Sequence, residues 1–231
     1  MRALAILHDA LSETGFIGER AVERGFDVDE LTICAGPDDP SSDVEFPDPT
    51  AYDAVLSFGA VWSVYDREAI GSWIDRELDM IRRAHDTGVP VLGICFGGQA
   101  LAAALGGTVT AAPNMEVGWY DIDSDVPDDV AVGPWLQWHG DRFLVPPAAR
   151  ELARGGVGSQ AFVTRRSLGV QFHPEATVDV VDFWVEYGAD TLASLGIDPA
   201  SLRDETRRNA PAARANAHRL FDYFMNDVAR R

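Results

Sequence analysis

Apolar segments of strand length alternate with helical patterns over roughly the first hundred residues, and this order constrains the fold most. The short apolar segments are RALAIL (2–7), VDELTIC (28–34), AVLSF (54–58) and VPVLGI (89–94). Before the last of them, apolar residues recur at spacings of three and four, which predicts a long amphipathic helix containing Ile70, Trp73, Ile74, Leu78 and Ile81. Strand followed by helix in this rhythm predicts a mostly parallel open sheet with helices on both faces.

The pattern changes after Gly107. Shorter pieces of alternating polarity predict a smaller antiparallel or mixed strand region, in which two strands pair across a turn at Ser167. From Val178 onward the pattern is helical again. We therefore predict one α/β domain over residues 1–185 and a C-terminal helical extension over residues 186–231 that packs on the same domain.

The charge balance argues against two classes of partner. The 231 residues carry a formal net charge of -18, and a surface of that sign repels nucleic acid and anionic membranes. No run approaches the roughly 18 apolar residues of a membrane-spanning helix, and the start MRALAILHDA turns polar too soon for a secretion signal. We expect a cytoplasmic protein with no membrane and no nucleic acid as partner.

Cysteine and lysine usage narrows the chemistry further. Cys34 and Cys95 are the two cysteines, and neither has a second cysteine nearby that would suggest a zinc site. All 19 basic residues other than histidine are arginine, which excludes a lysine Schiff base, a Ser-Lys dyad and a phosphate-binding loop that ends in lysine. We predict neither a metal nor a cofactor.

Cys95 stands in the sequence Gly-x-Cys-x-Gly-Gly, between an apolar strand and an alanine-rich helical segment. This order is typical of a nucleophile elbow, in which a sharp turn lifts the side chain above the carboxyl edge of the sheet. The thiol would lie at a helix N-terminus, whose partial positive charge favours the thiolate, and the N–H of Phe96 would face a developing oxyanion. Taken alone, the motif fits a small buried cysteine as well as it fits a nucleophile.

A nucleophilic cysteine needs a base, and the sequence offers five histidines. His85 and His218 fall in helical segments and are predicted at the surface, and His8 ends the first strand at the rim of the sheet. His173 follows an apolar strand in GVQFHPE, with Glu175 two residues later. Residues at that spacing point the same way in an extended segment, so the Glu175 carboxylate can orient the His173 ring.

These motifs together resemble a known family. GICFGGQ followed far downstream by FHPE is similar to the class I, or triad, glutamine amidotransferases, and in particular to the glutaminase domain of GMP synthetase and its stand-alone relatives. The segments LSFGAVWSVYD (56–66), MEVGWYDI (115–122) and WHGDRF (138–143) resemble further elements of that family in the same order. The resemblance implies the flavodoxin-like fold of the class I amidotransferases.

The resemblance also implies a role for each matching residue. Cys95 would attack the γ-amide of glutamine to form a thioester, His173 would transfer the proton, and Glu175 would orient His173. Phe96 and Gly59 would supply the backbone N–H groups of the oxyanion hole. Four residues would contact the bound L-glutamine or a related γ-glutamyl molecule: Gln99, His139, Gly140 and Asp141. For His139 and Asp141, a structural role stays equally open.

Two departures from the family pattern bear on function. The family's Gly-Gly-Pro is Phe58-Gly59-Ala60 here, with one apparent extra residue before Ser63, so the direction of the Gly59 N–H is uncertain from sequence. Nothing resembles the ATP-pyrophosphatase domain of GMP synthetase, so ammonia would pass to a separate acceptor synthase.

Three functional hypotheses follow. The first is a glutamine-hydrolysing enzyme that releases ammonia for a separate acceptor enzyme. The second keeps the triad but hydrolyses a γ-glutamyl amide or peptide without a synthase partner. The third is a binding module without catalysis, whose expected mark is a broken triad.

Overall fold

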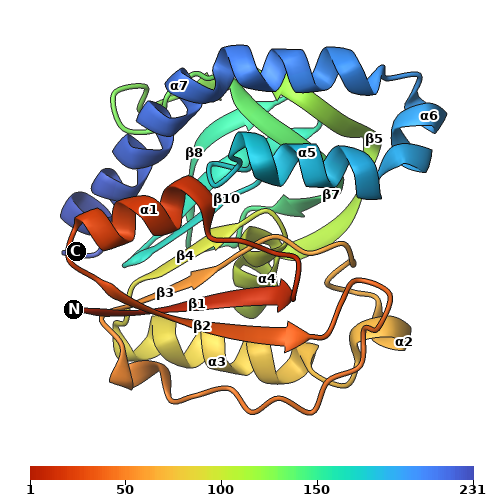
Figure 1. The fold of residues 1–231 in the computed structure, drawn as a ribbon. Helices are drawn as coiled ribbons and strands as arrows, with labels where there is room; N and C mark the ends of the chain where they lie inside the picture. The colour runs from red at the N-terminus through yellow and green to blue at the C-terminus, as the bar shows by residue number, and fades with distance from the viewer.

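The computed structural model describes all 231 residues and confirms the α/β fold (Figure 1). The main sheet has eight strands, in the spatial order β2 (Asp27–Cys34), β1 (Arg2–Asp9), β3 (Ala54–Ser57), β4 (Val91–Ile94), β10 (Ser167–Val170), β9 (Gly158–Thr164), β8 (Arg150–Gly155) and β6 (Asp123–Ser124). The pairs from β2 to β10 are parallel, and those from β10 to β6 are antiparallel. The parallel half therefore places the carboxyl ends of β1, β3, β4 and β10 at one edge.

Two long strands, β5 (Thr108–Tyr120) and β7 (Trp135–Leu144), form a separate antiparallel pair beside the main sheet. The predicted turn at Ser167 is displaced by one residue from the observed turn. Ser167 is already the first residue of β10 and pairs with Thr164, so Arg165 and Arg166 make the turn. Arg165 adopts φ +47°, a left-handed conformation suited to a tight hairpin of this kind.

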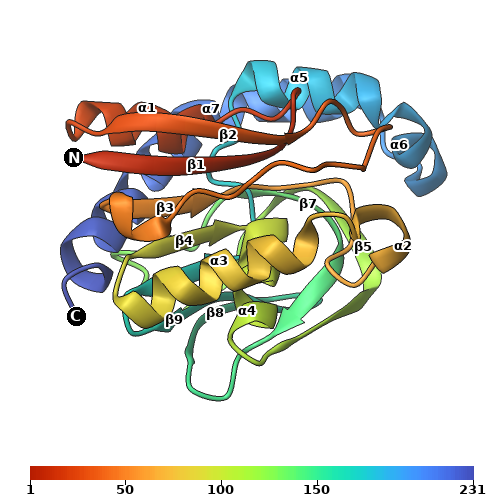
Figure 2. The same cartoon turned by 90° about the horizontal axis from the view of Figure 1, so that it is seen from below.

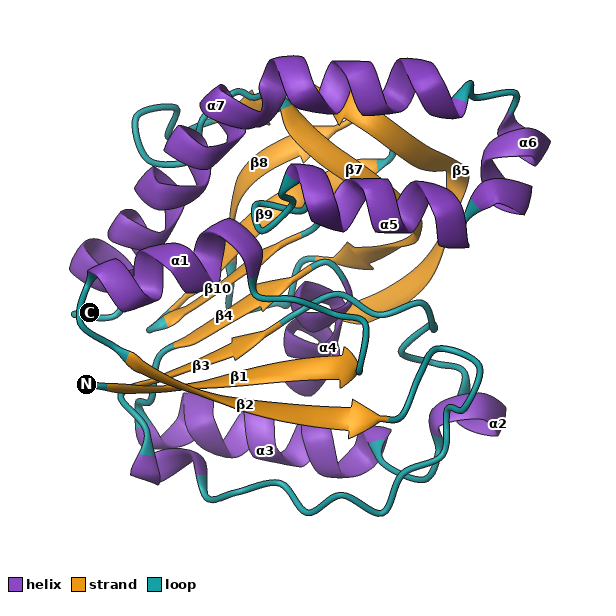
Figure 3. Ribbon diagram, viewed as in Figure 1, coloured by secondary structure: helices purple, strands orange, loops and turns teal.

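Helices cover both faces of the sheet, as Figure 3 shows in purple. They are α1 (Gly15–Glu23), α2 (Arg67–Ile70), α3 (Ile74–Thr87), α4 (Phe96–Ala104), α5 (Val178–Tyr187), α6 (Ala189–Leu195) and α7 (Pro199–Tyr223), with a 3₁₀ turn η1 (Pro49–Ala51) and a π turn η2 (Phe224–Val228). One apolar core packs α1 and α7 on one face, and a second packs α3 and α4 on the other. Figure 2 shows α3 lying along that second face.

The long helix predicted before the fourth strand is split into α2 and α3. Between them, Trp73 turns its ring inward and donates from Nε1 to the carbonyl of Pro40 at 2.8 Å, which interrupts the helix. The rest of the periodic pattern is confirmed, because Ile74 and Ile81 are fully buried and Gly88 ends α3 in a left-handed conformation, φ +82°.

The C-terminal helices lie against the rest of the molecule. Contacts join α7 to both α1 and α5, and Leu220, Phe221 and Phe224 are completely buried. None of the helices combines the length and apolar composition that crossing a bilayer requires.

Two histidines are placed differently from the prediction. His85 is not at the surface: it is 8% exposed, and its Nδ1 lies 2.8 Å from the hydroxyl oxygen of Ser167, because α3 turns this residue toward β10. His8 is not at the rim but completely buried, because β1 continues one residue further to Asp9.

Candidate active site

Cys95 occupies the sharp turn between β4 and α4. Its backbone adopts φ +51° and ψ -108°, a conformation that is strained for a residue with a side chain and typical of a nucleophile elbow. The neighbouring glycines make the turn sterically feasible. A Cβ at Gly97 would lie 2.1 Å from the carbonyl oxygen of Ser57, and one at Gly93 would lie 2.4 Å from the carbonyl oxygen of Gly97. The turn thus requires glycine at both positions.

His173 reaches Cys95 because β4 and β10 are neighbours. These parallel strands pair Ile94 with Val170, and the Cys95 N–H donates to the Val170 carbonyl at 2.9 Å. The His173 N–H donates to the Leu136 carbonyl on β7 at 2.9 Å, which anchors the segment after β10. The predicted nucleophile and the predicted base, which are far apart in sequence, therefore meet at the carboxyl edge of the sheet.

Glu175 holds the His173 ring. Oε1 of Glu175 lies 2.7 Å from Nδ1 of His173, and both side chains are almost completely buried. The other ring nitrogen, Nε2, is buried without a hydrogen-bond partner, and so is Oε2 of Glu175. The ring is therefore fixed at Nδ1 and free to exchange a proton at Nε2.

The electrostatic surroundings favour the protonated form of His173. Burial opposes the charged ring, but the neighbouring Cys95 and Glu175 outweigh that effect and hold the pKa of His173 well above its usual value of 6.5. A raised pKa keeps on His173 a proton that the ring can deliver to a leaving group.

Backbone donors are available next to Cys95. Phe96 is the first residue of α4, so its N–H has no partner within the helix, and the N–H of Gly59 makes no backbone hydrogen bond. The Phe58 carbonyl accepts from the Gly97 N–H at 3.0 Å. Because a trans peptide is planar, this bond turns the Gly59 N–H in the opposite direction. A Cβ at Gly59 would lie 3.1 Å from Cε1 of His173 and 3.9 Å from Cβ of Cys95, so this backbone borders both side chains.

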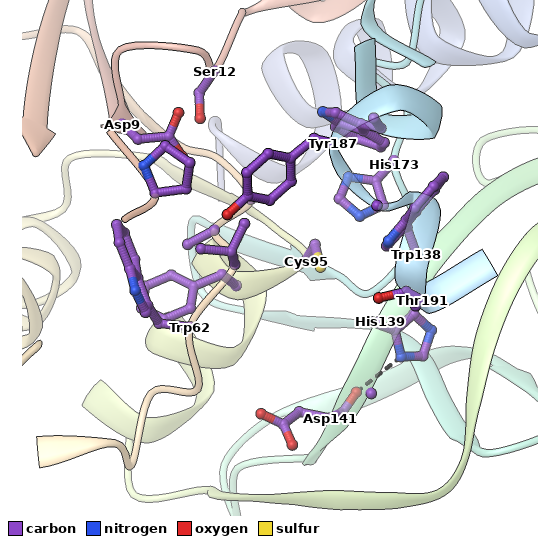
Figure 4. A pocket seen from close by; sticks show the side chains of 18 of the residues that line it. Asp9, Ser12, Trp62, Cys95, Trp138, His139, Asp141, His173, Tyr187 and Thr191 are labelled. Carbon is purple, nitrogen blue, oxygen red and sulfur yellow. Dashed lines mark hydrogen bonds between the residues drawn. The ribbon is translucent and has the colours of Figure 1, made fainter. Parts of the chain in front are cut away.

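A cavity of about 420 Å³ opens above Cys95 (Figure 4). Gly59, Phe96, Gln99 and the segment 139–141 all line it. The structure also shows a wall of aromatic side chains that the motifs do not reveal: Trp62, Trp138, Phe183, Trp184 and Tyr187. Trp184 stands edge-on to His173, with ring centroids 4.7 Å apart.

The predicted ligand-contacting residues differ in which polar groups they leave free to bind a ligand. The His139 ring is occupied by the scaffold, because Nδ1 lies 2.9 Å from the Asp141 carbonyl and Nε2 lies 2.9 Å from Oε1 of Gln137. The Asp141 carboxylate accepts from the Tyr65 hydroxyl at 2.8 Å. The Gln99 amide donates to Oε1 of Gln171 at 3.4 Å. Gly140 has open space around its Cα, so this backbone is accessible.

Sequence reasoning missed Gln171. Its amide nitrogen lies 3.8 Å from the sulfur of Cys95, and the residue is completely buried. Gln171 precedes His173 by two residues in GVQFHPE, so alternation along the strand could have placed both on one side.

Outside this cavity, one group of side chains has the spacing of metal ligands: Glu19, Glu23 and His218. Arg214 donates to both carboxylates, so an arginine already balances their charge. A cation is therefore disfavoured there.

Comparison with known proteins agrees with this geometry. Residues 17–182 match the family model described as "Glutamine amidotransferase class-I". The chain is 34% identical over 157 residues to the glutamine-hydrolyzing GMP synthase of Limosilactobacillus reuteri, which covers 62% of this chain and 27% of that protein. It is 30% identical over 161 residues to the glutamine-hydrolyzing GMP synthase of Listeria monocytogenes. That match covers 65% of this chain and 28% of that protein.

A solved structure matches over nearly the whole chain. A glutamine amidotransferase from Thermotoga maritima superposes with a TM-score of 0.84 at 26% identity, covering 98% of this chain and 99% of that one. A glutamine amidotransferase from Methylobacillus flagellatus, 24% identical with a TM-score of 0.84, has the same fold. The chain belongs to the class I glutamine amidotransferases, a family of enzymes. It spans about a quarter of the length of the two GMP synthases named above.

Proposed function

We propose that this enzyme hydrolyses the γ-amide of L-glutamine and releases ammonia for a separate acceptor enzyme. The observation that carries the proposal is the arrangement around His173, with Glu175 bonded to Nδ1, Nε2 left without a partner, and Cys95 near enough to raise the pKa of the ring. The family membership and the two free backbone donors support the same reaction.

The proposed reaction has two steps. The Cys95 sulfur attacks the carbonyl carbon of the γ-carboxamide of glutamine, and the carbonyl oxygen becomes an oxyanion that accepts hydrogen bonds from the N–H groups of Phe96 and Gly59. His173 then gives its Nε2 proton to the departing nitrogen, which leaves as ammonia, and a thioester remains on Cys95. In the second step a water loses a proton to His173 and attacks the thioester, which releases glutamate and restores the thiol.

The cavity supports the binding role predicted for its other residues. We propose that Gln99 and the backbone around Gly140 and Asp141 contact the amino-acid end of glutamine, because they line the cavity and leave polar groups within it. The His139 ring would instead hold the 139–141 segment in place, since both of its nitrogens are occupied.

The acceptor of ammonia would be a separate synthase. The GMP synthases that match are about four times longer than the matched segment, which fits a division of the reaction between a glutamine-hydrolysing part and an ammonia-accepting part. A chain without lysine also lacks the usual side chain for holding a transferred phosphate.

The test is a direct assay of the purified protein with L-glutamine. We expect equal amounts of glutamate and ammonia, and a thioester on Cys95 detectable by mass spectrometry after rapid acid quenching. Cys95→Ala is the control and should lose turnover entirely. Equal turnover by wild type and Cys95→Ala would contradict the triad assignment.

One observation favours a second candidate substrate. The cavity is larger than glutamine alone fills, and its aromatic wall lies beside His173, where the leaving amine would depart. A γ-glutamyl amide or peptide with an apolar amine part would occupy that space. Comparing kcat/KM for L-glutamine with that for γ-glutamyl-4-nitroanilide separates the two candidates, because preference for the anilide would favour the second.

A further inference from the structure

The side chain of His8, on β1, lies directly against the backbone that carries the proposed oxyanion hole. Its Nδ1 lies 3.0 Å from the carbonyl oxygen of Gly59. Its ring also meets the Phe96 ring edge-on, with centroids 4.6 Å apart. His8 thus touches both residues whose N–H groups are proposed to form the oxyanion hole, although it is completely buried and does not line the cavity.

Two further buried side chains hold this imidazole. Nε2 of His8 lies 3.1 and 3.2 Å from the two carboxylate oxygens of Glu77, on α3. The Ser57 hydroxyl, at the end of β3, donates to Oε1 of Glu77 at 3.0 Å. All three side chains are completely buried. Such a network persists in an apolar core only if every polar group in it is satisfied.

The hydrogen-bond partners fix where the proton on His8 must be. The Gly59 carbonyl can only accept, so Nδ1 carries a hydrogen. If Glu77 is ionised, it accepts a second hydrogen from Nε2, and if Glu77 is protonated, it donates to Nε2. Both arrangements leave the pair neutral as a whole and keep the Nδ1–H bond to Gly59.

We propose that His8, held by Glu77, is a positioning residue that keeps the Gly59 loop in the conformation of a working oxyanion hole. The inference rests on the proposed hydrolytic function. The bond from Nδ1 turns the Gly59 carbonyl toward the protein interior, away from the cavity that Gly59 and Ala60 line. If that peptide flipped, its carbonyl oxygen would face the cavity and repel the developing oxyanion.

The sequence of the loop explains why such a restraint is needed. Glycine permits a peptide flip at little steric cost, and Gly59 must stay small because a Cβ there would press on His173. A proline after the glycine would restrict that glycine's backbone, but this chain has Ala60 in that place. His8 supplies the restriction from beneath the loop.

Two substitutions of His8 separate its two hydrogen bonds. The amide nitrogen of asparagine falls near the position of Nδ1, whereas that of glutamine reaches the position of Nε2. His8→Asn therefore keeps a donor for Gly59, and His8→Gln keeps only a contact with Glu77. We expect His8→Gln to lower kcat about 100-fold with little change in KM, the effect of losing one oxyanion donor. His8→Asn should recover most of that loss.

The comparison is made with L-glutamine and with 4-nitrophenyl acetate, which acylates a cysteine without any γ-glutamyl group. Urea unfolding of both variants shows whether they are folded and equally destabilised. Equal loss of kcat in the two variants, or full activity of His8→Gln, would overturn the proposal. A wild-type protein that neither hydrolyses glutamine nor releases 4-nitrophenol in a Cys95-dependent way would overturn both this inference and the proposed function. A wild type that hydrolyses the ester but not glutamine, with the same ranking of variants, would support this inference and contradict the proposed function.

Discussion

Nδ1 of His173 is bonded to Oε1 of Glu175 at 2.7 Å, while Nε2 of the same ring is buried and unpartnered. The carboxylate therefore selects the tautomer and orientation of the ring without occupying Nε2, which stays available for proton exchange. This division of the two nitrogens is what a general base next to a nucleophile requires.

Replacing Glu175 by glutamine should disrupt that selection. The amide of the new side chain can donate to Nδ1 and would place the ring hydrogen on Nε2, where it blocks proton transfer from the thiol. We expect Glu175→Gln to lower kcat about 10⁴-fold, as tautomer errors do in related triads. Steady-state glutaminase kinetics measure the effect, and Glu45→Gln, at an exposed glutamate, is the matched control.

The same pair makes stability depend on pH. The pKa of His173 is higher in the folded protein than its usual value of 6.5, so its protonation stabilises the folded state fully below about pH 6.5. That stabilisation is lost as the pH rises through the folded-state pKa. The free energy of unfolding of the wild type should therefore be higher than that of Glu175→Gln. We expect this difference to be largest near pH 6 and smaller at higher pH. Urea unfolding across this range provides the measurement, and a pH-independent difference would contradict the assignment.

The two cysteines should differ in reactivity. Burial raises the pKa of Cys34 to about 11, and nearby Asp39 and Asp9 act in the same direction. Its thiol also lies 3.4 Å from the Pro40 carbonyl. At pH 7.5 iodoacetamide should therefore modify Cys95 alone. Peptide mass mapping would show one adduct in wild type and in Cys34→Ser, and none in Cys95→Ser. Modification of Cys34 in the folded wild type would show that this reasoning is wrong.

Gly97 should not tolerate alanine. The added methyl group would meet the backbone of Ser57, which cannot move without shifting β3 against the elbow. Overpacking of this kind costs about 1–3 kcal/mol in the free energy of unfolding. Gly36→Ala is the control, since a Cβ there has no neighbour within 4 Å. Thermal or urea unfolding distinguishes the two, and equal stability of the variants would contradict the close approach at Gly97.

The sequence predicts the parts of this structure that depend on local pattern. Strand and helix alternation predicts the parallel half of the sheet, and the glycines around Cys95 predict its turn. The resemblance to a known family brings His173 and Glu175 to the same place, although β4 and β10 are far apart in the chain.

What the sequence does not predict depends on contacts between distant segments. Trp184 faces His173 because α5 folds back over the carboxyl edge, and no local pattern indicates which side of an amphipathic helix will meet a ring. The pairing of His8 with Glu77 is equally hidden, because Glu77 is one of many charged residues in the amphipathic helix α3 and its partner is found only when β1 and α3 pack. From the sequence alone, a histidine at the end of a strand is expected at the rim of the sheet. In the structure, packing against α3 and Phe96 buries His8 completely.

The position of β10 between β4 and β9 has a consequence for the growing or truncated chain. A polypeptide that includes Cys95 but ends before residue 167 contains the thiol and lacks the proposed base His173, the Glu175 carboxylate and Gln171. Cys95 therefore cannot act as a triad nucleophile until the middle of the sheet has been filled. Catalytic activity therefore requires a completed sheet. Fragments left by incomplete synthesis or proteolysis would not hydrolyse cellular amides.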